Sequence, residues 1–265
     1  MGESDRSRES FNTVVDWYDR YRRGYPVEVI ERIVETAQIG PGSHALEIGS
    51  GTGQLTRPLL ERGITVTAVE LGEALAERAR KNLGHFVGFH VDVSSFETWA
   101  LPRKCFDAVL SATAFHWLDP NVRAAKSGRA LKAGGRLVAV YPHLVSGEDH
   151  GFFHDSQTSY LKWGLSIDPD FRLPTREEVV PMHADIEKCP AFTHVDRLRI
   201  LKTRHFTTDE YVGLLHTDSL VLTLSPPALE GFLADIAALI ESRYDGKIVR
   251  HYLYEIVVAQ KTSAP

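Results

Sequence analysis

A short stretch of the sequence places a carboxylate next to a glycine-rich loop, a combination suited to binding a polar ligand. In LEIGSGTG, Leu46 to Gly53, Glu47 is followed at alternate positions by Gly49, Gly51 and Gly53. Glycine has no Cβ, so such a loop turns sharply and its backbone can approach a ligand closely. A helix that begins after the loop presents unpaired backbone N–H groups to ligand oxygens.

The spacing of these glycines argues against two common nucleotide-binding loops. A G-x-G-x-x-G pattern that begins at Gly49 needs glycine at position 54, where the chain has Gln54. No G-K-[ST] follows, so the segment does not match a P-loop either. A glycine-rich turn also occurs as an ordinary strand–helix junction, and by itself it predicts no particular ligand.

Two further carboxylates follow apolar runs and make the pattern more specific. Glu70 ends the run VTAVE, and 70 − 53 = 17 residues separate it from Gly53. An acid at that distance can accept hydrogen bonds from both ribose hydroxyls. Asp92, in FHVDV, can accept from an adenine amino group. Each acid could instead cap a helix, but the three carboxylates together predict a nucleoside-binding site.

These residues need strand ends that meet at one edge of a sheet, and the periodicity predicts such elements. Apolar runs alternate with amphipathic helices, which indicates crossover connections and a parallel sheet. The predicted strands are 44–48, 64–69, 86–91, 106–111 and 135–141, and the predicted helices are 26–37, 54–62, 73–83 and 121–131. Further along, the sequence predicts strands at 192–201 and 251–259, a T-x-x-E capping box at Thr207 and Glu210, and an apolar helix at 229–240.

The regular pattern changes after about residue 142, where Pro, Gly, His and aromatic residues are scattered without a clear period. We therefore expect a single α/β domain with an inserted lid rather than two domains. The expected parts are a flexible tail at 1–10, a domain at 11–265, and within it a covering segment 11–40, a binding core 41–141, a substrate-side insertion 142–205 and a closing part 206–265.

Composition narrows the classes of function. The 265 residues carry 30 basic and 35 acidic side chains, 30 − 35 = −5, which argues against a nucleic-acid surface dominated by positive charge. Cys105 and Cys189 are far apart, so neither a disulfide framework nor a zinc ribbon is expected. No apolar run approaches the roughly 20 residues of a membrane span. We expect a cytoplasmic protein, a monomer or homodimer, with no metal, membrane or nucleic-acid partner.

The segments together resemble the Rossmann-like, class I S-adenosylmethionine-dependent methyltransferases, from about Phe11 to Leu144. LEIGSGTG, AVEL, HVDVSSFE, FDAVLSATAFHWLDP and LKAGGRLVAV are similar to successive motifs of that family. The resemblance implies an α/β fold with a seven-stranded, mainly parallel sheet, helices on both faces and an antiparallel last strand, plus a helical and irregular lid. It also implies the cofactor S-adenosyl-L-methionine and the product S-adenosyl-L-homocysteine.

Carried over to this chain, the family's cofactor-binding positions are Tyr18, Arg22, Tyr25, Glu47, Gly49, Gly51, Gly53, Glu70, Leu71, Asp92, Val93, Ser111 and Ala112. The opening YDRYRRGYP and the phrase AFHWLD are similar to trans-aconitate methyltransferase-like enzymes, in which this opening covers the cofactor. Arg23 stands where those relatives have proline, which leaves the local turn geometry open. Tyr18 could equally pack an N-terminal helix.

The resemblance implies a small-molecule acceptor that is methylated on a carboxylate or hydroxyl oxygen. His116, in AFHWL, is the candidate catalytic residue, because an imidazole can accept a proton or orient an oxygen. It could also be a structural histidine. Arg172 and Arg176 are candidates for holding an acidic acceptor. Two other functions stay open: nucleoside-cofactor binding without catalysis, and an NAD-linked oxidoreductase, which the glycine spacing disfavours.

Overall fold

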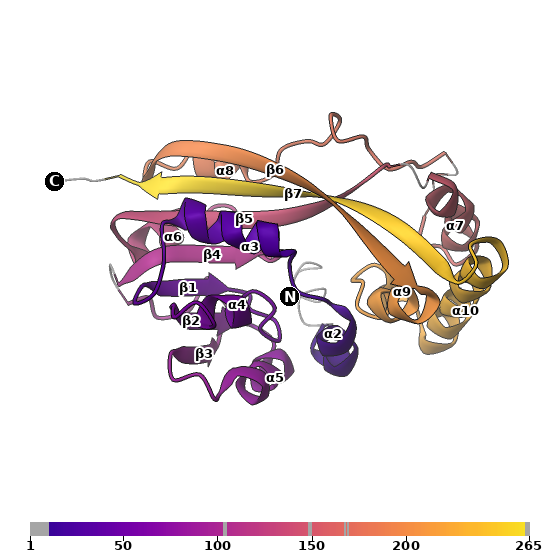
Figure 1. Cartoon of the computed structure of the whole chain (residues 1–265), viewed down its shortest axis with the longest axis horizontal. Helices are drawn as coiled ribbons and strands as arrows, with labels where there is room; N and C mark the ends of the chain where they lie inside the picture. The colour runs from indigo at the N-terminus through magenta and orange to yellow at the C-terminus, as the bar shows by residue number, and fades with distance from the viewer. Residues whose placement is uncertain (1–10, 103–104, 148–149, 167, 169, 263–265) are drawn as a thin grey trace.

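A seven-stranded sheet runs the length of the protein, in the order β3-β2-β1-β4-β5-β7-β6 (Figure 1). The structure, a computed structural model, describes residues 11–102, 105–147, 150–166, 168 and 170–262; the predicted tail 1–10 lies outside them. The strands are β1 (His44–Ile48), β2 (Thr65–Glu70), β3 (Phe89–Val93), β4 (Phe106–Ala112), β5 (Leu131–Val145), β6 (Phe192–Thr207) and β7 (Lys247–Lys261). Strands β1 to β5 pair in parallel, and β7 is antiparallel to both β5 and β6, which confirms the predicted fold class.

Helices cover both faces of the sheet, which is why its central strands are continuously apolar. On one face α3 (Val27–Ala37) and α4 (Thr56–Leu60) pack their buried residues onto β1, β4 and β5. On the other face α6 (Arg123–Ala130) and α8 (Ala184–Glu187) cover the same strands. Helix α5 (Glu73–Leu83) packs Ala76 between β2 and β3.

The outer three strands are much longer than the central ones. Beyond the parallel core, β6 and β7 continue to a group of three helices, α7 (His150–Lys162), α9 (Thr208–Leu215) and α10 (Pro226–Arg243) (Figure 1). The strand predicted at 192–201 extends to Thr207 because its pairing with β7 continues to Lys247. The range 142–205 therefore contains most of a sheet strand besides α7 and α8.

The chain's opening forms a short helix that joins the parallel core to the far helices. After the turn η1 (Phe11–Val14), α2 (Val15–Tyr21) binds α5 through Asp19, which accepts from Arg78 at 3.0 Å and Asn82 at 2.8 Å. Its C-terminal end contacts α9, because Tyr21 Oη donates to Asp209 at 3.0 Å. The remaining short turns are η2 (Phe115–Trp117) and η3 (Val221–Thr223).

Helix α9 begins where the capping box predicts. The Thr207 side chain accepts from the backbone N–H of Glu210, and the Glu210 carboxylate accepts from the backbone N–H of Thr207 at 3.1 Å. Two N–H groups at the helix start are thereby satisfied. None of the helices described is long and apolar enough to cross a bilayer.

Candidate active site

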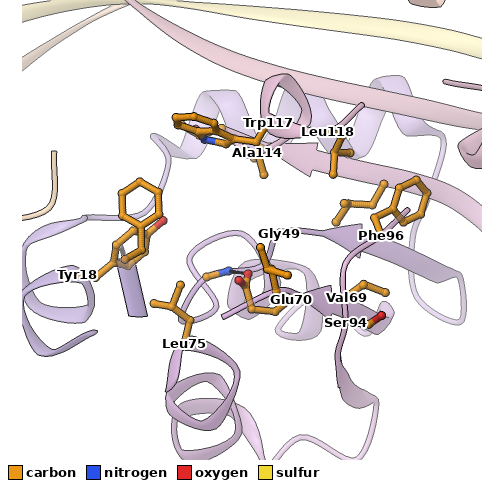
Figure 2. A pocket seen from close by; sticks show the side chains of 16 residues that line it. Tyr18, Gly49, Val69, Glu70, Leu75, Ser94, Phe96, Ala114, Trp117 and Leu118 are labelled. Carbon is orange, nitrogen blue, oxygen red and sulfur yellow. Dashed lines mark hydrogen bonds between the residues drawn. The ribbon is translucent and has the colours of Figure 1, made fainter. Parts of the chain in front are cut away.

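A cavity of about 630 Å³ opens where the carboxyl ends of β1, β2 and β4 meet, and we call it the glycine-loop cavity (Figure 2). This is the point at which the strand order reverses between β1 and β4, the usual ligand position in an open α/β sheet. Its lining comes from the loop after β1, the end of β2, the segment after β3, the turn after β4 and the opening segment. The lining residues are Phe11, Tyr18, Ile48, Gly49, Gly51, Val69, Glu70, Leu71, Leu75, Ser94, Phe96, Ala112, Thr113, Ala114, Trp117 and Leu118.

The glycine loop has backbone conformations that other residues rarely adopt. Gly49, Gly51 and Gly53 have φ angles of +72°, +58° and +104°. A Cβ at Gly49 would lie 2.4 Å from the Cβ of Ala114 across the cavity mouth, and one at Gly53 would lie 2.5 Å from Leu83 Cδ1. Glycine is therefore needed both for the turn and for close packing.

Backbone hydrogen bonds from the glycine loop and from the start of α5 hold Glu70 in place. Its Oε2 accepts from the N–H of Gly51 at 2.9 Å, and its Oε1 accepts from the N–H of Gly72 at 2.9 Å. Each carboxylate oxygen has two lone pairs and can accept more than one hydrogen bond. Figure 2 shows Glu70 near Gly49 at the middle of the cavity. The backbone thus orients an acid suited to a ribose diol.

The other walls form an apolar slot that the sequence analysis did not identify. Leu75 of α5, Phe96 after β3 and Leu118 after η2 line it, together with the rings of Tyr18 and Trp117 (Figure 2). A flat aromatic base fits such a slot by burial of its faces. The signal was weak, because apolar residues that follow a strand occur equally often in an ordinary core.

Four predicted cofactor-binding residues line neither this cavity nor the second one described below: Gly53, Asp92, Val93 and Ser111. The Asp92 carboxylate accepts from Trp99 Nε1 at 2.9 Å, and Val93 is 43% exposed. The buried Ser111 hydroxyl donates to the carbonyl of Ile48 at 3.0 Å. Ligand contact by these four residues stays a prediction.

A second, larger cavity of about 1570 Å³ adjoins the first, and we call it the tyrosine cavity. Its walls include five tyrosines of the sheet and far helices, Tyr141, Tyr160, Tyr211, Tyr252 and Tyr254. It also contains the predicted residues Tyr18, Arg22, Tyr25, Glu47 and His116. The two cavities share Phe11, Tyr18, Gly49, Ala112, Thr113 and Trp117. Two ligands, one in each cavity, would therefore meet at these shared residues, which we call the common wall.

Thr113 in the common wall has a strained backbone that its surroundings hold in place. Its φ is +60°, which is unusual for a β-branched residue. Its N–H donates to Val140 O at 2.8 Å, and its hydroxyl hydrogen bonds the hydroxyl of Tyr25 at 2.8 Å. Burial raises the pKa of Tyr25, so this phenol stays neutral. Strain of this kind is commonly found at functional sites.

Glu47, at the end of β1, is a buried acid that is protonated at neutral pH. Burial, together with the nearby Glu70, raises the pKa of Glu47 to about 8, although the Thr56 hydroxyl donates to it at 2.7 Å. A positively charged ligand group in the tyrosine cavity would lower that pKa and favour the carboxylate.

His116 reaches the tyrosine cavity from η2 as a neutral imidazole. Burial, followed by the charges of Arg123 and Arg22, lowers the pKa of His116 to about 4. Its Nδ1 is buried and has no hydrogen-bond partner among the residues described. Its ring meets the Tyr141 ring edge to face at 4.9 Å. A neutral imidazole has a nitrogen lone pair that can accept a hydrogen bond or a proton, and the burial and charges that lower the pKa of His116 oppose the protonated form.

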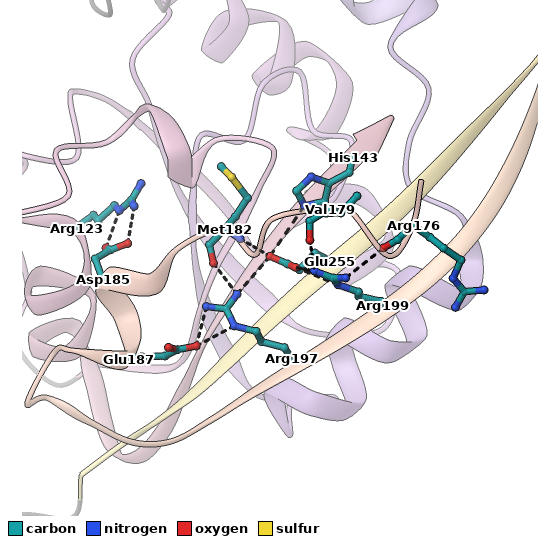
Figure 3. A network of polar contacts seen from close by, with 10 residues as sticks. All are labelled: Arg123, His143, Arg176, Val179, Met182, Asp185, Glu187, Arg197, Arg199 and Glu255. Carbon is teal, nitrogen blue, oxygen red and sulfur yellow. Dashed lines mark hydrogen bonds and ion pairs between the residues drawn. The ribbon is translucent and has the colours of Figure 1, made fainter. Parts of the chain in front are cut away.

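Ion pairs and hydrogen bonds connect α8 and the residues just before it to α6 and to the sheet (Figure 3). Arg123 donates to Phe115 O at 2.7 Å and binds both oxygens of Asp185, at 2.8 and 2.6 Å. The fully buried Glu255 of β7 accepts from Met182 N at 2.7 Å and from Arg199 at 3.0 Å. Arg123 thereby fixes the residue that precedes His116.

His183, at the start of α8, makes the folded protein sensitive to acid. Burial, with Arg123 nearby, lowers the pKa of His183 to about 3. The unfolded chain, with a pKa near 6.5, therefore takes up the proton first as pH falls, and stability present above pH 6.5 is lost below it. Between pH 6.5 and 5 this one group should cost roughly 1.5 kcal/mol.

Urea unfolding at the two pH values measures this cost directly. In His183→Asn the fall in unfolding free energy should be smaller by roughly 1.5 kcal/mol, because the amide does not titrate. The exposed His205 provides a matched control, and His205→Asn should keep the wild-type difference. An unchanged pH dependence in His183→Asn would contradict the assignment.

The two arginines suggested for an acidic acceptor lie outside the tyrosine cavity. Arg172 binds Glu178 with two bonds of 2.7 Å, and Arg176 lies 3.3 Å from Glu177. The two side chains are 68% and 61% exposed, so both belong to the protein surface. An acceptor in the tyrosine cavity would need other cations.

The sequence is similar to those of known methyltransferases. A family described as "Methyltransferase domain" matches residues 46–139. An uncharacterized methyltransferase of Mycobacterium tuberculosis (strain ATCC 25618 / H37Rv) is 36% identical over 132 residues, 50% of this chain and 51% of that protein. The chain thus matches about half the length of this relative. A malonyl-[acyl-carrier protein] O-methyltransferase of Geobacter sulfurreducens is 31% identical over 188 residues, 68% of each protein.

A solved structure shares the fold over most of the chain. It is a putative methyltransferase from an antibiotic biosynthesis pathway of Anabaena variabilis, with a TM-score of 0.60 and 17% sequence identity. The similarity covers 88% of this chain and 98% of that one.

Proposed function

The chain belongs to the Rossmann-like, class I S-adenosylmethionine-dependent methyltransferases, and from this premise we propose that it transfers a methyl group from S-adenosylmethionine to a small-molecule acceptor. The observation that carries this proposal is the pair of cavities that adjoin at Gly49 and Thr113. One has the features of a nucleoside site, and the other has room for an acceptor. The acceptor atom we propose is a carboxylate or hydroxyl oxygen.

The residues of the glycine-loop cavity fit this cofactor. Glu70 is oriented to accept from ribose hydroxyls, and the apolar side chains of Leu75, Phe96 and Leu118 suit the adenine. In the adjoining part of the tyrosine cavity, the buried Ser50 hydroxyl has no partner among the described residues. We assign Tyr18, Arg22, Tyr25 and Glu47, which line the same region, to the methionine part. When bound, the cofactor supplies an activated methyl group, so the protein needs only to align and shield the reactants.

The opening segment excludes water from the common wall. Phe11 packs edge to face on both Tyr18 and Trp117. Arg22 lies over the rings of Phe11 and Tyr18 and donates to Thr217 Oγ1 at 3.0 Å and to Thr217 O at 2.7 Å. Alignment of reacting groups in a binding site can contribute about 7–11 kcal/mol. We propose that residues 11–40 cover the cofactor, 41–141 bind it, and 142–205 with 206–265 surround the acceptor.

The oxygen acceptor finds support in the similarity to an O-methyltransferase. A carboxylate acceptor is already anionic, whereas a hydroxyl must lose a proton during transfer. His116 lines the acceptor cavity and is neutral at physiological pH, so we assign it the role of accepting that proton. The trans-aconitate subgroup and the cytoplasmic location stay predictions from the sequence.

Replacement of His116 tests its role. With a hydroxyl acceptor, His116→Asn should lower the transfer rate by about 10²–10⁴-fold, because asparagine cannot accept the proton. The affinity for S-adenosylmethionine should stay within about twofold, since His116 is not among the residues that we assign to the cofactor. The wild-type rate should show no titration of this group between pH 6 and 8, because the pKa of His116 is about 4.

Labelled-methyl assays measure the rate, with the exposed His85→Asn as control. A wild-type rate in His116→Asn would exclude the proton-accepting role for that acceptor.

The function itself is tested by calorimetry and an acceptor screen. We expect S-adenosylmethionine and S-adenosylhomocysteine to bind and NAD not to bind. A screen of metabolite acids, phenols and amines with labelled cofactor should then yield a methylated oxygen. Cofactor binding without transfer to any acceptor would favour the nucleoside-binding alternative. Binding of NAD in place of S-adenosylmethionine would contradict the proposal.

A further inference from the structure

Two arginines face each other across the antiparallel strands that form one wall of the tyrosine cavity. Arg204 of β6 is the register partner of Arg250 of β7, and both line the cavity. Like charges directly opposite each other destabilise a strand pair. Lys202, two residues before Arg204 on the same strand, has its charge paired, because its Nζ donates to the Glu28 carboxylate at 2.6 Å. In the part of the chain that the structure describes, neither arginine has a carboxylate partner.

The contacts that these arginines do make are with neutral groups. The Arg250 guanidinium lies over the Tyr211 ring at 5.1 Å and the Phe153 ring at 5.9 Å, and it donates to Tyr211 Oη. Its Nε is buried and has no partner among the residues described. The Arg204 guanidinium lies over the Phe206 ring at 5.5 Å. Rings and hydroxyls hold the guanidinium groups in place but leave their charge uncompensated.

The acids that line the same cavity are engaged elsewhere. Asp218 Oδ1 accepts from the backbone N–H groups of Leu220 and Val221, at 2.9 and 3.2 Å. Glu47, in β1, accepts a hydrogen bond from the Thr56 hydroxyl at 2.7 Å. Among the described residues, the wall formed by β6 and β7 therefore has two positive charges that are not paired with a carboxylate.

We propose that Arg204 and Arg250 bind an oxyanion of the methyl acceptor, a carboxylate at the end of the molecule remote from the methylated atom. Guanidinium groups bind carboxylates with paired, charge-assisted hydrogen bonds. This proposal rests on the proposed function in one respect: the methylated atom is taken to lie beside the common wall. The oxyanion site itself follows from the cross-strand arginine pair.

The strand register indicates how far apart the two ends of the acceptor lie. Val140 of β5 pairs with Ala112 of the common wall on one side and with Ile256 of β7 on the other. Arg250 lies 256 − 250 = 6 residues from Ile256, about 20 Å along the strand at ~3.3 Å per residue. The long arginine side chains shorten this gap. The acceptor class is thus an elongated acid, and the tyrosines between the two ends favour an aromatic or unsaturated body.

A pair of fluorescent probes tests the oxyanion site without knowledge of the natural acceptor. The probes are 8-anilinonaphthalene-1-sulfonate, an aromatic oxyanion, and N-phenyl-1-naphthylamine, which has the same ring system and no charge. The full chain should bind the anionic probe at least about tenfold more tightly, as expected for one charge-assisted contact. Arg204→Met and Arg250→Met should each remove most of that preference and leave the affinity for the neutral probe within about twofold.

Matched variants separate the charge from the packing. Methionine keeps an apolar stem against Phe206 or Tyr211, and Arg250→Lys keeps the positive charge and should retain most of the anion preference. Arg176→Met removes an exposed arginine outside the cavity and should change nothing. Equal wild-type affinity for both probes would overturn the proposal. An unchanged anion affinity in the Arg204→Met/Arg250→Met double variant would overturn it as well.

Cofactor titration distinguishes failure of this site from failure of the proposed function. Neither arginine is among the residues that we assign to the cofactor, so both methionine variants should bind S-adenosylmethionine as the wild type does. If the wild type discriminates between the probes but does not bind the cofactor, the proposed function is wrong and the anion site remains. If the cofactor binds and neither substitution changes the affinity for the anionic probe, only the proposed anion site is wrong.

Discussion

Glu70→Ala is expected to weaken S-adenosylmethionine binding by at least about 100-fold, because two hydrogen bonds donated to a charged acceptor are worth roughly 1.5–3 kcal/mol each. The substitution also removes the acceptor from the N–H groups of Gly51 and Gly72. An unsatisfied buried N–H costs about 1–3 kcal/mol. We therefore expect a lower unfolding free energy together with the loss of affinity. Glu70→Gln should be intermediate, since its amide has one oxygen to offer.

Calorimetric titration measures the affinity, and urea unfolding of the same preparations measures the stability. The control is Glu77→Ala, which removes an exposed carboxylate from α5 nearby and should affect neither quantity strongly. If Glu70→Ala stays folded and binds the cofactor with wild-type affinity, the ribose site lies elsewhere.

The second large effect is expected for Gly49→Ala. The new Cβ would lie 2.4 Å from the Cβ of Ala114, so the turn after β4 must shift. This shift would change the shape of the common wall of the two cavities. Alanine at a φ of +72° also costs about 1–2 kcal/mol in backbone strain. We expect methyl transfer to fall by at least about 100-fold, because misplacement of reacting groups by about 1 Å costs a factor of that order.

Gly42→Ala isolates the steric effect from the backbone strain. Gly42 has a φ of +87°, but a Cβ there would meet nothing within 4 Å, and it lies in the loop before β1. Both variants should lose stability in urea, Gly49→Ala more because of its clash with Ala114, while Gly42→Ala should retain wild-type transfer. Equal activities of the two variants would show that the close approach of Gly49 to Ala114 is unimportant for the reaction.

Much of the parallel core could be predicted because its signals are local. The runs that became β1, β2 and β4 are apolar and short, and each ends next to glycine, a carboxylate or a small residue. The capping box at Thr207 depends on four consecutive residues and was confirmed for the same reason. The boundaries of β5, β6 and β7 were missed, because pairing across strands far apart in sequence extends them.

The candidate site shows the same division. Glu70 and Gly49 could be located from spacing alone, since the chain direction brings strand ends to one edge. The direction of a side chain at that edge depends on packing, and Asp92 turns to Trp99 instead of the cavity. For the acceptor, exposed Arg172 and Arg176 were named, whereas the cavity is lined by Arg22 and Arg23 of the opening segment and by the cross-strand pair Arg204 and Arg250. These two are 46 residues apart, 250 − 204, and only the strand register makes them neighbours.

The sequence by itself determined the family, the order of the core elements and the position of the glycine loop after the first strand, because these depend on periodicity and on short motifs. The tertiary structure decided the rest: the helix α2 over the cavity mouth, the neutral state of His116, the protonated state of Glu47 and the unpaired cations of the acceptor cavity. Burial and charge depend on which distant segments pack together, and in this protein the long antiparallel strands β6 and β7 bring those segments into contact.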